Sequence, residues 1–98
     1  MKYPYLENMI GAYLNQDYAY HASTLEGVID VCKNEEEAEY VRCLRADIAR
    51  FLHDHQGATL EQEFETAFGA DFDPKLFGLT AEGFLKKLDR QLQGSTEP

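Results

Sequence analysis

The 98-residue chain is strongly acidic, with 18 Asp and Glu residues against 9 Lys and Arg and a formal net charge of −9. This balance argues against direct binding to nucleic acid or to an anionic membrane, and it favours a basic partner. The length predicts one domain over residues 1–98, with a flexible tail at 94–98. We expect a cytoplasmic protein, because no apolar run could span a membrane and the first residues, MKYPYLE, lack a secretory signal.

The first half of the chain predicts two helices separated by a loop. Apolar residues at helical spacing run from near Pro4 to residue 14, and Gly11 within them is expected to allow close approach of a neighbouring helix. Residues 15–22 show no helical or alternating pattern and predict a loop. Ser23 and Glu26 form a capping box that predicts a short second helix, ending near residue 34.

The most regular helical pattern covers residues 34–56. Its apolar residues recur in steps of three and four, which places them on one face of a helix about 30 Å long. Asn34 is expected to cap the start, and Gly57 to follow the last turn in a left-handed conformation. Because no other segment is as long, we expect the other helices to pack along it.

The last third of the chain predicts two more helices around an irregular segment. Thr59 and Gln62 repeat the capping pattern for a helix that ends at Gly69, and Thr80 is the expected cap of a helix that runs to about residue 93. Between them, Phe72, Leu76 and Phe77 are expected to be tucked into the core. With no strand pattern, the predicted fold is an all-α, single-domain bundle of about five helices packed along one long central helix.

No motif indicates catalysis, a cofactor or a metal site. The three histidines are His21, His53 and His55, and the last two are spaced so that they point away from each other on a helix. We therefore predict no catalytic residue, no cofactor and no metal. A metal-dependent enzyme that uses the histidines stays an alternative, which metal analysis of the purified protein would decide.

Residues 71–82 imitate a calcium-binding loop. Asp71, Asp73 and Glu82 occupy its first, third and twelfth positions. Lys75 replaces an oxygen ligand, however, and Leu76 replaces the glycine that makes the turn. The segment therefore predicts an Asp-Pro turn.

Negative charge is concentrated between residues 15 and 40, where seven acidic residues face one lysine for a net charge of −6. Four of them are glutamates within residues 35–39, with no basic side chain nearby in the sequence to offset them. One interpretation is a solvated helix start, which the helix dipole favours. The other is a surface for a basic partner, and both interpretations stay open.

Aromatic residues favour the second interpretation, because tyrosine buries a large ring while its hydroxyl tolerates water. They lie in the same acidic half of the chain, partly within the predicted loop. The predicted partner-binding residues are Asp17, Tyr18, Tyr20, His21, Glu35, Glu36, Glu37 and Glu39.

Two segments, YLNQDY at residues 13–18 and GADFDP at residues 69–74, resemble a family of small helical immunity proteins from bacterial contact-dependent growth inhibition systems. The likeness covers about residues 3–92. The family pattern usually has a tryptophan or another aromatic residue after the aspartate, and Tyr18 fits this loosely. The middle, residues 34–56, is similar only in being acidic and helical.

The resemblance implies a cytoplasmic protein that binds the C-terminal toxin domain delivered by a neighbouring sibling cell and catalyses nothing itself. Many such toxins are nucleases with basic clefts, which suits a negatively charged inhibitor. The resemblance carries no fixed list of contact residues, and we expect a monomer. The alternative is an acidic adaptor or regulatory subunit for another basic protein. A gene that directly follows a very large secreted-protein gene would favour the immunity function.

Overall fold

The computed structural model describes residues 2–15 and 23–94, which form α-helices and one 3-10 turn without any strand. No helix in these residues is both long and apolar enough to cross a membrane. The predicted all-α, single-domain class is confirmed. The elements are α1 (Pro4–Tyr13), α2 (Leu25–Glu35), α3 (Ala38–Asp54), α4 (Gly57–Phe68), η2 (Pro74–Phe77) and α5 (Ala81–Gly94).

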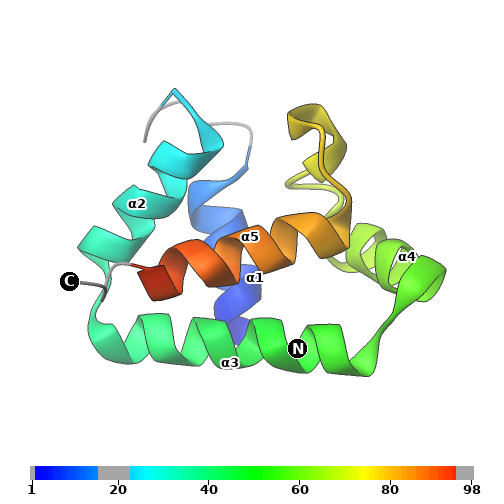
Figure 1. Cartoon of the computed structure of the whole chain (residues 1–98), viewed down its shortest axis with the longest axis horizontal. Helices are drawn as coiled ribbons and strands as arrows, with labels where there is room; N and C mark the ends of the chain where they lie inside the picture. Colours follow the sequence, from blue (N-terminus) through cyan, green and yellow to red (C-terminus); the bar gives the residue numbers. More distant parts are fainter. Residues whose placement is uncertain (1, 16–22, 95–98) are drawn as a thin grey trace.

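The helices are arranged around the pair formed by α3 and α5. These two lie side by side and run in opposite directions, while α2 and α4 lie at opposite ends of the pair (Figure 1). Helix α1 crosses the pair and packs on α3 and α2. Helix α5 packs against α2, α3, α4 and η2. The longest helix, α3, is thus one side of the bundle, and α5 is the element on which most others converge.

A cluster of phenylalanines joins the second half of the chain into one core. The ring of Phe64 on α4 lies 6.1 Å from that of Phe51 on α3 and 5.9 Å from that of Phe84 on α5. Phe72, which precedes η2, lies 4.7 Å from Phe84. These edge-on and tilted contacts contribute beyond the buried area itself. The predicted burial of Phe72 is therefore confirmed.

The long helix begins later than predicted. Asn34 lies in the last turn of α2, because the N–H of Glu36 still donates to the carbonyl of Cys32 at 3.0 Å. Glu36 and Glu37 are extended, with ψ values of 154° and 160°, and the chain turns there. The expected Asn34 cap is therefore wrong. Glu37 is the N-cap residue of α3, without a side-chain cap hydrogen bond.

Two other predicted caps shift and one is confirmed. Helix α2 is capped by Thr24 rather than Ser23, since the Thr24 hydroxyl accepts from the Gly27 N–H at 3.0 Å. Helix α4 begins at Gly57, before the expected cap at Thr59. The Thr80 cap of α5 is confirmed, because its hydroxyl accepts from the Gly83 N–H at 2.9 Å.

The N-terminus of α1 is capped by a carboxylate from a distant helix. Asp47 on α3 accepts from the backbone N–H groups of Tyr5 at 2.7 Å and Leu6 at 3.1 Å with one oxygen, and it pairs with Arg50 through the other. Asp47 is only 4% exposed and is the buried charged residue of the described chain. It thereby fixes the position of α1 on α3, because unpaired N–H groups at a helix start need an acceptor.

Helix α5 starts in the same way. Glu61 on α4 accepts from the N–H groups of Ala81 at 2.8 Å and Glu82 at 3.1 Å. The negative carboxylate also suits the positive end of the helix dipole. Together with the Thr80 hydroxyl, it satisfies the first turn of α5 and ties α4 to it.

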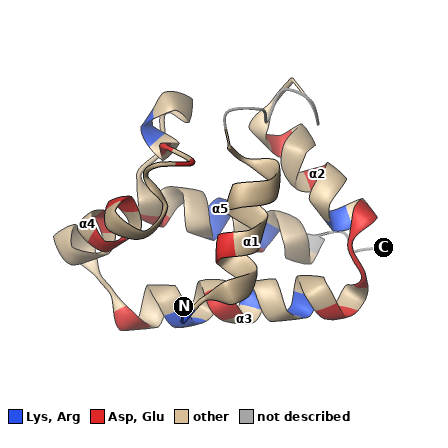
Figure 2. Cartoon of the chain, turned by 180° about the vertical axis from the view of Figure 1, so that it is seen from behind, with Lys and Arg blue, Asp and Glu red and all other residues tan. Residues whose placement is uncertain are grey.

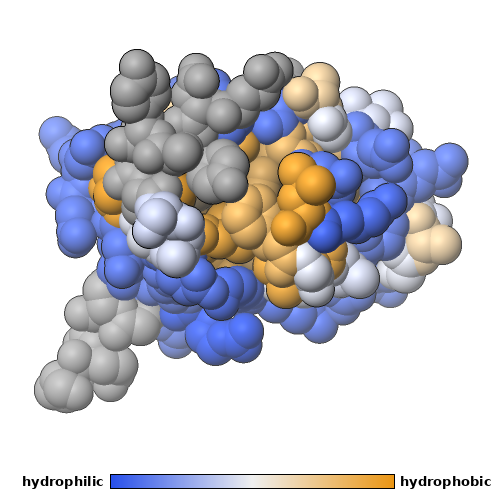
Figure 3. All heavy atoms as spheres, turned by 90° about the horizontal axis from the view of Figure 1, so that it is seen from above, coloured by the Kyte–Doolittle hydropathy of each residue, from blue (hydrophilic) through white to orange (hydrophobic). Residues whose placement is uncertain are grey.

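The surface above η2 departs from expectation. Leu76 is 80% exposed, so its predicted burial is wrong, and Phe77 is half-buried. A four-residue turn presents one side to solvent, and Leu76 lies on that side. Viewed from above, apolar side chains gather in the middle of the molecule with hydrophilic ones around them (Figure 3). At Gly11, an added Cβ would meet no atom of the described residues within 4 Å, so none of the described helices needs that glycine for close approach.

Candidate functional site

Acidic residues follow one another where α2 ends and α3 begins (Figure 2). Glu35 closes α2, the extended Glu36 and Glu37 form the turn, and Glu39 lies in the first turn of α3. We call these four residues the acidic corner. The structure thus brings all four predicted glutamates together, at a turn rather than along one helix.

Tyr13 of α1 holds two carboxylates of the acidic corner. Its hydroxyl donates to Glu35 Oε1 at 3.0 Å and to Glu36 Oε2 at 2.8 Å, while the ring is buried. Burial, followed by these hydrogen bonds, raises the pKa of Tyr13 well above its usual value of 10. The hydroxyl therefore stays protonated and remains a donor. The sequence did not reveal this contact, because the partners lie 22 and 23 residues apart.

The remaining two glutamates differ in their partners. Glu39 forms an ion pair with Arg42, one turn later on the same face of α3, so the expectation that no nearby base offsets the glutamates is wrong here. The hydrogen bond from Arg42 lowers the pKa of Glu39. Both side chains are about two-thirds exposed, so the pair is weak. Glu37 is exposed, and its carboxylate has no hydrogen bond or ion pair with another described residue. It is the carboxylate of the corner that a partner reaches most readily.

Other acidic residues of the region are engaged within the fold. Glu26 pairs with Lys87 at 2.8 Å, and the hydrogen bond from that lysine lowers the pKa of Glu26. Asp30 accepts from the side-chain amide of Gln91 at 3.0 Å. Both tie α2 to α5. The negative surface open to a partner is therefore narrower than the charge count over residues 15–40 indicates.

The other half of the predicted set lies outside the described residues. Asp17, Tyr18, Tyr20 and His21 belong to residues 16–22, which the structure does not describe. These four stay predictions from the sequence.

The regions weighed for metal chemistry have structural roles. The ring of His55 lies 4.7 Å from that of Phe51, while His53 is exposed. Asp73 Oδ1 accepts from the Lys75 N–H at 3.0 Å, so the predicted Asp-Pro turn is present. Among residues 2–15 and 23–94, no three His, Cys, Asp or Glu side chains come together as a metal ion requires.

Comparison with known families gives a match over nearly the whole chain. The family described as "CdiI immunity protein" matches residues 2–92 of 98. Neither the curated proteins nor the solved structures gave a match.

Proposed function

The chain belongs to the CdiI immunity protein family, and on that premise we propose that it binds and neutralises a cognate toxin domain of contact-dependent growth inhibition. In this proposal the toxin is a nuclease, and the acidic corner covers its basic active site. The protein acts in the cytoplasm as a monomer and transforms no substrate.

The arrangement of the acidic corner carries the proposal. Tyr13 holds Glu35 and Glu36 in place, so these carboxylates lose little conformational freedom when a partner binds. Glu37 lies next to them in the chain, and its exposed carboxylate has no partner among the described residues. A nuclease cleft lined with Lys or Arg presents the opposite charge, and charge-assisted hydrogen bonds to carboxylates are stronger than neutral ones.

The proposed contact set is completed from the sequence. Asp17, Tyr18, Tyr20 and His21 combine one more carboxylate with rings suited to the centre of an interface. Glu39 belongs to the rim, because a partner must share it with Arg42.

The experiment is co-expression with the toxin domain encoded directly upstream, with growth and complex formation as the two measurements. The wild-type chain is expected to restore growth and to copurify with the domain. Glu37→Lys should weaken the complex about tenfold or more and reduce protection, because it places a cation against a basic cleft.

The matched control is Glu63→Lys, which makes the same charge change at an exposed position of α4. It should protect as well as the wild-type chain. Equal protection by both variants would place the interface elsewhere, and failure of the wild-type chain to form a complex would refute the proposed function.

A further inference from the structure

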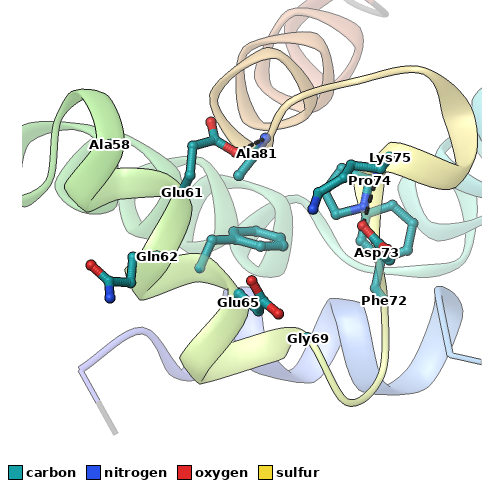
Figure 4. Close-up of a pocket in the computed structure, with 11 residues that line it drawn as sticks. Ala58, Glu61, Gln62, Glu65, Gly69, Phe72, Asp73, Pro74, Lys75 and Ala81 are labelled. Atoms are coloured by element: carbon teal, nitrogen blue, oxygen red, sulfur yellow. Dashed lines mark hydrogen bonds between the residues drawn. The ribbon is translucent and has the colours of Figure 1, made fainter.

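A pocket lies at the opposite end of the molecule from the acidic corner, where α4, η2 and the start of α5 meet (Figures 1 and 4). Its volume is about 380 Å³, near the low end of the roughly 300–1,000 Å³ typical of ligand pockets. Phe64 and Phe72 line it from the core side and are 1% and 5% exposed. The pocket thus has an apolar floor that belongs to the packed phenylalanine cluster.

Carboxylates surround the mouth of this pocket. Glu61 and Glu65 come from α4, and Asp73 faces them from the segment before η2 (Figure 4). Glu61 is engaged, because both its oxygens accept backbone N–H groups of α5. Asp73 accepts one N–H with Oδ1, and Glu65 is exposed, with a carboxylate that has no hydrogen bond or ion pair to another described residue. Glu65 and Asp73 therefore offer acceptors to an incoming group.

Lys75 is the basic residue of the pocket lining, and its position indicates that a cationic group can enter the pocket. The Lys75 side chain extends into the pocket (Figure 4), yet it forms no ion pair with a described carboxylate. The Lys75 ammonium group thus enters the acidic pocket without pairing with one of its carboxylates. In the part of the chain that the structure describes, these carboxylates do not form a group of three or more ligands that could hold a metal ion. An organic cation is therefore the class of ligand that these carboxylates favour.

We infer that this pocket receives an arginine side chain from a protein partner. The guanidinium lies between Glu65 and Asp73, and the aliphatic stem lies against Phe64 and Phe72. Arginine suits the site better than lysine, because its planar fork donates to two carboxylates at once and its stem tolerates an apolar floor. The inference rests on the proposed function only in naming the toxin domain as the partner that supplies the arginine.

The test is a titration of the full chain, followed by backbone amide shifts in NMR, with N-acetyl-arginine amide as the probe. The matched probe is N-acetyl-citrulline amide, which keeps the shape and lacks the charge. We expect saturable shifts at Gly69, Asp73 and Lys75 with the arginine probe only.

Substitutions at three exposed residues test in which direction the affinity for the arginine probe changes. Glu65→Gln should weaken binding of the arginine probe at least threefold, because it removes one carboxylate. Lys75→Met should strengthen binding, because it removes the competing ammonium. Glu63→Gln, outside the pocket on the same helix, should leave binding unchanged.

Three results would overturn the inference: no saturable shift, equal shifts with the citrulline probe, or weaker binding after Lys75→Met. The last result would mean that the lysine attracts the ligand rather than competing with it. Because the titration contains no toxin, its failure leaves the growth test of the proposed function standing. A failed growth test likewise leaves the titration informative.

Discussion

The carboxylate of Asp47 caps α1 and also pairs with Arg50, so its removal is expected to lower the stability of the fold. In Asp47→Ala, the N–H groups of Tyr5 and Leu6 lose their acceptor and Arg50 loses its partner. We expect the free energy of unfolding to fall by about 2–4 kcal/mol, measured by urea denaturation. Glu63→Ala, an exposed control, should change it by no more than about 0.5 kcal/mol. A similar loss in both variants would contradict the capping role.

Tyr13 predicts how stability depends on alkaline pH. Its pKa in the folded chain is raised above 10 by burial and by Glu36 and Glu35, so above pH 10 the unfolded chain loses this proton while the folded chain keeps it. The contribution of Tyr13 to the free energy of unfolding is therefore fully present below about pH 10 and is lost as the pH rises further. In Tyr13→Phe the fall should be shallower, by up to about 1.4 kcal/mol per pH unit.

Urea midpoints between pH 8 and pH 11 measure this difference. The comparison between the two chains removes the contribution of lysines, which both share. At pH 7 the variant should lose about 1 kcal/mol, because it lacks the hydroxyl proton that Glu35 and Glu36 share. Parallel curves above pH 10 would show that the hydroxyl does not titrate differently in the folded and unfolded states.

The candidate site was predictable from the sequence in part. Four closely spaced glutamates are visible as a charge pattern, but the contact with Tyr13 depends on how α1 docks against the end of α2. Asp47 did leave a signal, since it falls on the buried stripe three residues after Leu44. A carboxylate on an apolar stripe needs internal donors. Which donors it finds is decided only by tertiary packing.

At the scale of whole elements, substitution by alanine is expected to change stability in opposite directions at two glycines. Gly57 has a φ of 61° where α4 begins, and Gly11 lies inside α1. At either position, an added Cβ meets no atom of the described residues within 4 Å. Gly57→Ala should therefore cost about 1–2 kcal/mol through backbone strain alone. Gly11→Ala should stabilise the protein by about 0.5–1 kcal/mol, because alanine favours the helix.

Thermal or urea unfolding of the two variants, compared with the wild-type chain, measures both the expected loss and the expected gain of stability. Because neither methyl group meets a neighbour, packing does not obscure the comparison. Destabilisation by Gly11→Ala would show that this glycine serves a close approach after all. An unchanged midpoint for Gly57→Ala would mean that the turn between α3 and α4 adapts.

The number and order of helices were predictable because each carries its own apolar stripe. Helix boundaries were less so where two cap signals compete. Asn34 and Thr59 have suitable side chains, yet α2 continues past Asn34, and α4 starts before Thr59. In both places we attribute the boundary to core packing, because a helix must begin where its apolar face can point toward the core. Local capping chemistry contributes only about 1 kcal/mol and yields to that packing.

At the scale of the whole molecule, the question is whether partner attraction comes from the total charge or from the acidic corner. Glu37→Lys and Glu63→Lys each change the formal net charge from −9 to −7, but on elements at opposite ends of a molecule 35 Å long. The Debye length is about 30 Å at 0.01 M salt and about 8 Å at 0.15 M. At low salt, charges at both ends of the molecule therefore act on an approaching partner. Near physiological salt, only the charges at the end that the partner approaches do so.

We accordingly expect the two variants to slow association with the toxin domain similarly at 0.01 M salt. At 0.15 M salt, only Glu37→Lys should remain slower than the wild-type chain. Stopped-flow mixing with the toxin domain at both salt concentrations measures these rates, and steering of this kind falls steeply with ionic strength. If Glu63→Lys were the slower variant at 0.15 M, the partner would approach the α4 end. The arginine pocket, rather than the acidic corner, would then lie at the centre of the interface.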